Sequence, residues 1–402
     1  MKFDESSLYY IKSNVVGTRY SLFDLATWKN GLSFKKTDFS DTGRPVIKIA
    51  ELNNGITSST SFTQGSYSED VFIRWDDLLF SWSGNPQTSI DVFRYRLREG
   101  WLNQHIFKVT PNEEYITKDF LYYVLKHLKP NFTQIATNKQ TTGLGHVTVA
   151  DLKRMSLVIP SKEMQNQIVF VLKTIDDKIE TNRRINDNLL QQAQSIFAHE
   201  FLAFAGLPYG WHESSLLGIA DYLNGLAMQK YRPKVDEQGL PVLKIKELRQ
   251  GSCDSNSEQC SPSIKPEYIV HDGDVIFSWS GSLLVDLWCG GTCGLNQHLF
   301  KVTSSKYDKW FYYAWTNHHL QEFIAIAADK ATTMGHIKRE ELSKAKVLVP
   351  PADEYDRISA LLAPIYDLII ANRIENRRLA ELRDQLLPRL MSGELDVSEV
   401  PL

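Results

Sequence analysis

The sequence predicts an α+β protein in which one module is written twice and each copy is followed by a long helix. Three observations predict this fold: four sequence blocks that recur in the same order, short strand-like runs within each half, and a seven-residue apolar period after each half. At 402 residues the chain has room for two or three domains. We expect a first module at residues 1–160, a first helix at 161–205, a second module at 206–351, and a second helix with a C-terminal tail at 352–402.

The repeat is clearest in the pentapeptide FSWSG, which occupies residues 80–84 and again 277–281. Three further blocks recur around it, and the offset between copies drifts from 197 at the pentapeptide to 193 and then 190 in the later blocks, as loops of different length would cause. This pattern indicates a duplication. The further blocks are residues 45–52 and 241–248, 102–109 and 295–302, and 139–147 and 330–337.

Each module reads as strands joined by loops, with one helix. Short apolar or alternating runs, separated by Gly, Asn, Asp and Pro, predict strands in the first module. Helical patterns at residues 115–128 and 310–328 predict one helix in each copy. The predicted strands include residues 46–49, 78–82, 106–109 and 155–159.

Apolar residues recur every seven positions after each module, which is typical of a coiled-coil seam. The seam has one asparagine at the same position in each helix, Asn182 and Asn372. We expect the helices to pair antiparallel about a pseudo-twofold axis, with Asn182 and Asn372 near that axis, within reach of each other and fixing the register. Other apolar residues widen the predicted packing face, among them Leu361, Leu362, Leu368, Ile369 and Leu382.

Composition and charge exclude several classes of protein. The net charge of -3 and a pI of about 6.4 argue against indiscriminate binding of polyanions, so a nucleic-acid site has to be a local patch. The acidic start and the lack of a long apolar run predict a cytoplasmic protein without a membrane span. Free thiols are expected for the four cysteines, and Cys289, Cys293 and His298 lack a fourth ligand, so no metal is predicted.

We find no complete catalytic motif in the sequence. The serines of the pentapeptide lack the first glycine of a nucleophile elbow, and the Gly-Lys of a phosphate loop never occurs. The stretch Asn85-Pro86-Gln87-Thr88 has only a superficial similarity to the Asn/Asp-Pro-Pro-aromatic motif of amino-methyltransferases. The sequence therefore favours a binding function over catalysis.

A duplicated module suits an extended ligand, and duplex DNA is the one whose features repeat along an axis. Small hydroxyls, lysines and glycine amides position phosphates, whereas Gln, Asn and Arg read base edges. Arg94, Arg96 and Arg98 alternate, so they project from one face if that segment is a strand. In the alternative interpretation the histidines are structural, Lys48 and Lys244 pair with nearby glutamates, and Trp82, Trp279, Phe107 and Phe300 belong to the core. Repeated residues also suit scaffold or phosphate contacts better than base reading. The DNA-contact candidates are Lys48, Ser81, Ser83, Gly84, Arg94, Arg96, Gln104, His105, Lys139, Thr141, Thr142, Lys244, Ser278, Ser280, Gly281, Gln297, His298, Lys330, Thr332 and Thr333.

Several motifs together resemble the specificity (S) subunit of type I restriction-modification systems, and the resemblance covers essentially the whole chain. They are the Asn-Gly pairs at 30–31 and 224–225, the Ser-x-Ser-Gly blocks, the Thr-Thr-x-Gly-His loops leading to VIP (158–160) and VLVPP (347–351), and the ending at 386–395. One departure is that Gln165-Asn166-Gln167 and Tyr355-Asp356-Arg357 stand where the family often has Glu-Gln.

The resemblance implies a DNA-recognition subunit with two target recognition domains that read the halves of a split site. It also implies that the helices set the spacer and dock two copies of an adenine-N6 methyltransferase subunit, with restriction subunits joining further. S-adenosylmethionine and ATP would belong to those partners, so the resemblance implies a non-catalytic chain that holds no cofactor. Two other interpretations stay open: a scaffold that binds only proteins, and a diverged methyltransferase.

Overall fold

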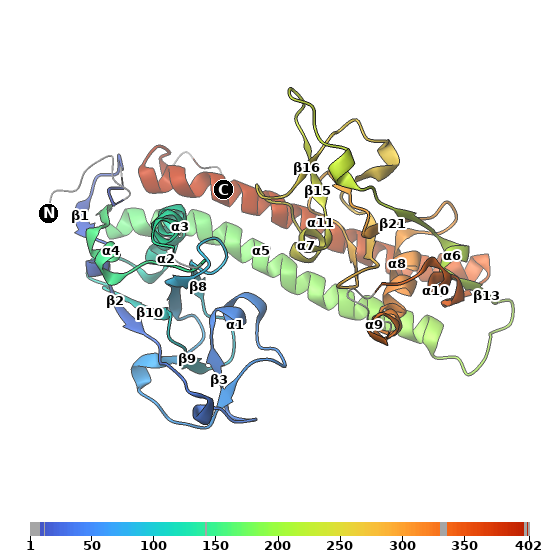
Figure 1. The fold of residues 1–402 in the computed structure, drawn as a ribbon, viewed down its shortest axis with the longest axis horizontal. Helices are drawn as coiled ribbons and strands as arrows, with labels where there is room; N and C mark the ends of the chain where they lie inside the picture. The colour runs from blue at the N-terminus through green and yellow to red at the C-terminus, as the bar shows by residue number, and fades with distance from the viewer. Residues whose placement is uncertain (1–8, 12, 141–142, 330–335, 398–399, 401–402) are drawn as a thin grey trace. The chain divides into compact units, whose positions relative to one another are not determined.

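The computed structural model describes residues 9–11, 13–140, 143–329, 336–397 and 400 (Figure 1). The chain forms two compact units. The first comprises Met1–Asp176 together with Glu381–Leu402, and the second comprises Asp177–Ala380. Both long helices contribute a segment to each unit, so the units divide the chain differently from the segments predicted above.

The first unit is built on four antiparallel or mixed sheets with four short helices around them. Its strands, in spatial order, are β2 (Ala26–Asn30), β10 (Ile106–Pro111), β6 (Leu78–Ser81) and β8 (Asp91–Arg94) in one sheet; β4 (Phe62–Thr63), β3 (Arg44–Ile47), β9 (Gly100–Leu102) and β5 (Phe72–Ile73) in another; and the pairs β1 (Thr18–Ser21) with β12 (Ser156–Ile159) and β7 (Ser83–Gly84) with β11 (Gly145–His146). Its short helices are α1 (Ile49–Asn54), α2 (Lys118–His127), α3 (Lys129–Asn138) and α4 (Val149–Arg154).

The second unit repeats this topology. Its three sheets have the same strand order, including one parallel pair in the same place, Val242 opposite Gly294 where the first unit has Val46 opposite Trp101. The sheets are β14 (Asp221–Asn224), β21 (Leu299–Thr303), β18 (Val275–Ser278) and β19 (Leu284–Leu287); β16 (Gln259–Cys260), β15 (Leu240–Leu243), β20 (Cys293–Leu295) and β17 (Ile269–Val270); and β13 (His212–Ser215) with β22 (Lys346–Val349). The short helices are α6 (Leu216–Ile219), α7 (Ile245–Gln250), α8 (Lys309–His318), α9 (Leu320–Asp329) and α10 (Arg339–Lys344).

The predicted duplication and strands are confirmed, but the single helix per module is wrong. In the first unit the predicted helix at 115–128 is α2, and α3 follows directly after it. In the second unit the range predicted as one helix, 310–328, is divided between α8 and α9. In the first unit, the side chain of Thr117 caps the start of α2. Pro130 lies in the first turn of α3 and has no N–H with which to continue α2.

The long helices are α5 (Lys162–Phe197), which continues as a π-helical turn to Leu202, and α11 (Ala352–Ser392). In the second unit the Asn182 amide donates to Asn376 Oδ1 at 2.9 Å, and the Asn372 amide donates to Asn186 Oδ1 at 2.9 Å. Because the partner number falls as the number along α5 rises, the two segments run antiparallel, as predicted.

Asn182 and Asn372 each bond an asparagine that lies one helical turn beyond the other seam asparagine. A second asparagine, Asn186 or Asn376, follows each of them four residues later, and the bonds cross between the two pairs. Residues four apart lie on the same helix face, so both asparagines of a helix reach the partner. The pairing is itself symmetric, since exchanging the helices exchanges the two bonds.

The packing face of α11 is narrower than predicted. Leu362 and Ile369 are buried, whereas Leu361 and Leu368 are each 46% exposed and Leu382 is 44% exposed. Successive residues of a helix lie about 100° apart. When Leu362 and Ile369 face the neighbouring segments, the residue before each of them points away. Within the described ranges, no helix is long and apolar enough to cross a bilayer.

Candidate nucleic-acid interface

The tryptophan of each pentapeptide lies at the surface end of a sheet, bound to the asparagine of an Asn-Gly pair. Trp82 Nε1–H donates to Asn30 Oδ1 at 3.0 Å, and Trp279 Nε1–H donates to Asn224 Oδ1 at 2.9 Å. Both indoles are only partly buried. The interpretation as core residues therefore holds only in part: each tryptophan packs against a buried phenylalanine but is itself partly exposed.

The ring of each tryptophan lies on a phenylalanine that does belong to the core. The centroid separation is 5.7 Å from Trp82 to Phe107 and also 5.7 Å from Trp279 to Phe300. Phe107 is 7% exposed and Phe300 is 6% exposed, because their strands lie in the middle of the main sheets. The tryptophans thus rest on a packed platform.

The glycine of each Asn-Gly pair lies so close to a neighbouring backbone segment that no side chain fits there. A Cβ on Gly31 would lie 2.1 Å from the carbonyl oxygen of Asn103, and one on Gly225 would lie 2.2 Å from that of Asn296. This close approach lets the Asn-Gly-Leu segment hydrogen-bond to the Leu-Asn-Gln-His segment in both units. The same contact therefore brings Gln104 and Gln297 next to the tryptophan sites.

Two histidines flank each tryptophan. His105 and His146 lie 5.3 and 6.0 Å from Trp82, centroid to centroid. In the second unit His298 and His336 lie 6.1 and 6.4 Å from Trp279. His105 is exposed and has a φ of 76°, which is uncommon for a residue other than glycine. Burial, and then the neighbouring His146, lower the pKa of His105, which favours the neutral imidazole.

The second serine of the pentapeptide bonds a different histidine in each unit. Ser83 Oγ lies 2.8 Å from His146 Nδ1, whereas Ser280 Oγ lies 3.0 Å from His298 Nδ1. Both serines are almost fully buried. They position imidazoles, and their hydroxyls have little surface with which to meet a ligand directly.

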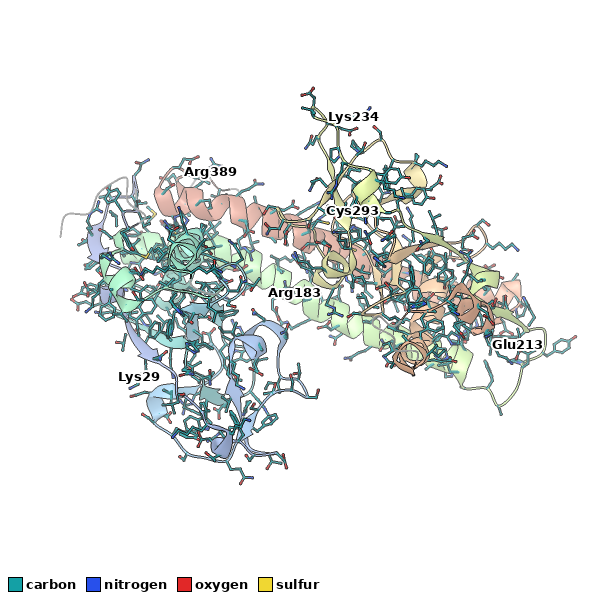
Figure 2. All side chains as sticks on the ribbon, viewed as in Figure 1. Lys29, Arg183, Glu213, Lys234, Cys293 and Arg389 are labelled. Carbon is teal, nitrogen blue, oxygen red and sulfur yellow. The ribbon has the colours of Figure 1, made fainter. Side chains whose placement is uncertain are left out.

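Exposed basic side chains follow each Asn-Gly pair. The first unit has Lys35 and Lys36 there, and the second has Lys230, Arg232 and Lys234. Figure 2 shows Lys234 at the outer end of its loop. Among the described residues, the side-chain nitrogens of Lys36 and Lys230 have no partner, and Lys234 has only the nearby charge of Glu237. Basic side chains in these loops are the kind of local patch that a near-neutral protein needs to bind DNA. The sequence candidates omitted them, because these basic residues do not repeat position by position.

Four of the predicted contacts are buried or tied to other groups. Ser81 and Ser278 have no exposed surface, because both end a central strand with the hydroxyl pointing inward, and they are corrected to structural residues. Lys48 Nζ donates to Ser61 Oγ at 3.1 Å, and Lys244 pairs with Glu258. The expected glutamate contacts involve the backbone: the N–H groups of Lys48 and Lys244 donate to the carboxylates of Glu51 and Glu247.

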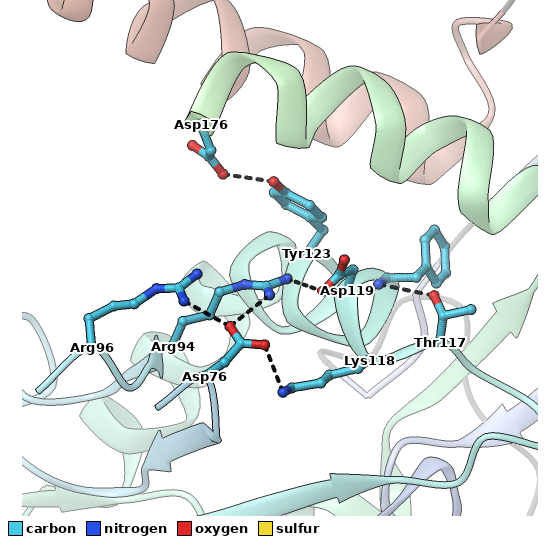
Figure 3. Close-up of polar contacts among 9 residues, drawn as sticks. Asp76, Arg94, Arg96, Thr117, Lys118, Asp119, Tyr123 and Asp176 are labelled. Atoms are coloured by element: carbon cyan, nitrogen blue, oxygen red, sulfur yellow. Dashed lines mark hydrogen bonds and ion pairs between the residues drawn. The ribbon is translucent and has the colours of Figure 1, made fainter. Parts of the chain in front are cut away.

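Arg94 and Arg96 do not project together toward a ligand (Figure 3). Arg94 bonds Asp119 at 2.6 Å and Asp76 at 3.3 Å and is only 14% exposed, and Arg96 bonds the same Asp76 at 3.2 Å. Only Arg94 lies in β8, so the predicted alternation along one strand does not exist. Burial alone would raise the pKa of Asp76, but Lys118 and the two arginines hold it below its usual range. This cluster fastens the sheet to α2.

Lys139 is also structural. Its Nζ lies 2.6 and 2.5 Å from the two carboxylate oxygens of Asp151, which has no exposed surface. Gly84 and Gly281 have positive φ of 137° and 65° and end the pentapeptides. Thr141, Thr142, Lys330, Thr332 and Thr333 lie outside the described residues.

Comparisons with known proteins agree with this geometry. The family description "Type I restriction modification DNA specificity domain" matches residues 18–191 and again 208–383. The chain is 24% identical over 322 residues to the type I restriction enzyme MjaIX specificity subunit of Methanocaldococcus jannaschii, covering 74% of this chain and 73% of that one. It is 21% identical to the EcoBI specificity subunit of Escherichia coli, covering 98% and 91%.

A solved S subunit from M. genitalium has the same fold, with a TM-score of 0.52 at 16% identity and coverage of 94% of this chain and 96% of that chain. The duplicated topology, the repeated tryptophan sites and the double match of the family agree with one another. This chain belongs to the family of type I restriction-modification DNA specificity domains, of which it carries two.

Proposed function

We propose that this chain is the non-catalytic subunit that gives a type I restriction-modification complex its DNA sequence specificity. Each unit carries one target recognition domain, and the two domains read the halves of a bipartite duplex target. The observation that carries the proposal is the repeated site: an accessible tryptophan held by Asn-Gly, flanked by two histidines, and followed by exposed basic side chains.

The chemistry of this site suits DNA. Lysines and glycine-rich backbone position phosphates, and the amides of Gln104 and Gln297 lie at the same surface as groups able to bond base edges. The residues corrected above leave a smaller set of contacts, centred on the Trp-His clusters and the basic loops.

The helices supply a second surface, which suits protein partners. Phe170 on the α5 segment of the first unit is 62% exposed, and Leu361 and Leu368 form an exposed stripe on α11 in the second unit. Exposed apolar side chains on helices typically mark protein contacts. We infer that these faces dock two copies of a methyltransferase subunit, which restriction subunits join.

Selection from a library of duplexes with random sequence tests the proposal, using the full chain alone and with a methyltransferase subunit encoded beside it. We expect a motif with two specified segments and an unspecified gap of fixed length. Trp82→Ala should weaken selection of one segment and Trp279→Ala of the other, because each tryptophan belongs to one unit.

Other outcomes would support the competing interpretations. Selection of no motif, with and without the methyltransferase subunit, would favour a protein scaffold. Binding of S-adenosylmethionine by this chain alone would favour a diverged methyltransferase.

A further inference from the structure

The loop that follows the first pentapeptide is longer than its counterpart in the second unit. Ser81 pairs with Asp91 across β6 and β8, and Ser278 pairs with Leu284 across β18 and β19. Nine residues, 82–90, make the first connection, whereas five residues, 279–283, make the second. The first unit therefore carries a longer loop directly after its tryptophan site.

This loop is held in one shape by Asn85. The Asn85 carbonyl accepts from Ser89 N–H at 2.8 Å, and its side-chain oxygen accepts from Gln87 N–H at 3.0 Å, which makes an Asx turn. Ser89 Cβ fills the space beside Gly84, and Ile90 is fully buried. The loop is therefore anchored at both ends and braced within, so ordering it on binding costs little entropy.

Two side chains of this loop are exposed to solvent. Gln87 and Thr88 are exposed, and neither side chain has a hydrogen-bond partner in the part of the chain that the structure describes. Asn85 differs from them, since the turn uses its side-chain oxygen. A free glutamine amide has a donor and an acceptor that match N6 and N7 of adenine in the major groove.

The loop also begins at the candidate interface. Ser83 and Gly84, which lead into it, pair with His146 and Gly145 in the short ladder of β7 and β11. His146 in turn flanks Trp82. DNA that meets the Trp-His cluster of the first unit therefore meets this loop as well.

We propose that residues 85–89 determine which bases the first unit reads, with Gln87 contacting an adenine of its half-site. The proposal rests on the proposed function of the chain and adds a residue that distinguishes the two half-sites. Since the loop of the second unit is four residues shorter, we expect the effect of residues 85–89 to be confined to one half-site.

The test is the duplex-library selection described above, with the full chain and the methyltransferase subunit encoded beside it. Gln87→Ala should lower the preference at one adenine position of one half-site about tenfold or more. Gln87→Glu should shift that position toward cytosine, because a carboxylate accepts from cytosine N4. Gln64→Ala is the matched control, an exposed amide of the same unit bonded to Thr42, and should leave the motif unchanged.

Selection of the second half-site serves as an internal control, because a variant that still selects it is folded. Loss of both half-sites in Gln87→Ala, or an unchanged preference in both Gln87 variants, would overturn the role of Gln87. Selection of no motif by the unmodified protein would instead overturn the proposed function, so the two failures are distinguishable.

Discussion

Asp151 is a carboxylate without exposed surface, yet it is charged and fully bonded. Besides Lys139, it accepts from Thr148 N–H at 2.7 Å and from Tyr9 OH at 3.0 Å, and it pairs with Arg154 at 3.0 Å. Burial alone would raise the pKa of Asp151, but these hydrogen bonds outweigh it and lower the pKa. Its folded pKa therefore lies below its unfolded pKa.

A lowered pKa makes the stability of the α4 region depend on pH. The contribution of Asp151 is present above its unfolded pKa of about 3.9 and is lost as the pH falls through the folded pKa. Asp151→Asn should cost about 2 kcal/mol at neutral pH and less in acid, since the bonds to a charged group are lost. Hydrogen exchange of the α4 amides, followed at neutral and at acidic pH, measures the loss of stability under both conditions. The control is Asp70→Asn, which removes an exposed ion pair with Lys29 and should leave this hydrogen exchange unchanged. If Asp151→Asn has the same pH profile of exchange as the unmodified protein, Asp151 is not the source of the pH dependence.

The basic residues after the Asn-Gly pairs predict a change in salt dependence. Each lysine that neutralises a phosphate contributes about 0.9 to the slope of log affinity against log salt concentration. Lys230→Ala with Lys234→Ala should lower that slope by about 2 without changing the selected motif. Lys344→Ala, which removes a lysine paired with Glu340 on α10, is the control and should leave the slope unchanged. If the slope falls equally in both variants, the overall charge of the protein, rather than this loop, is responsible for the salt dependence.

At the scale of elements, the sequence predicted the strands and long helices well because their patterns are local and occur twice. It missed what depends on distant partners. The alternation of Arg94, Arg96 and Arg98 suggested one exposed face, but Asp76 and Asp119, which bind Arg94, are not recognisable as its partners from spacing. The sequence also does not show which way the Ser81 side chain points, because the side chain of the last residue of a central strand can face either side of the sheet.

The four asparagines between α5 and α11 predict a coupled pair of substitutions. Asn372→Leu alone leaves the side-chain oxygen of Asn186 without its donor and should cost about 1–3 kcal/mol. Adding Asn186→Leu removes both partners, so the double variant should be less destabilised than the sum of the single ones. Urea unfolding of the four proteins in this cycle measures the coupling, and additive costs would show that the two asparagines do not interact.

At the scale of the whole molecule, the proposed function predicts that helix length controls the gap in the target. Insertion of four residues, about one turn, into α5 should widen the unspecified gap and leave both half-sites unchanged. Mapping of methylated adenines in a host that expresses the inserted protein with its methyltransferase subunit gives the gap directly. A changed half-site would count against a spacing role.

The division of the chain has a consequence for its synthesis on the ribosome. The second unit is continuous, from Asp177 to Ala380, but the first needs Glu381–Leu402 to be complete. Asn14 N–H, near the start, donates to the carbonyl of Ser392 at 2.7 Å, so a contact of the earliest residues awaits nearly the last ones. We therefore expect the half of the protein that is translated first to finish folding last.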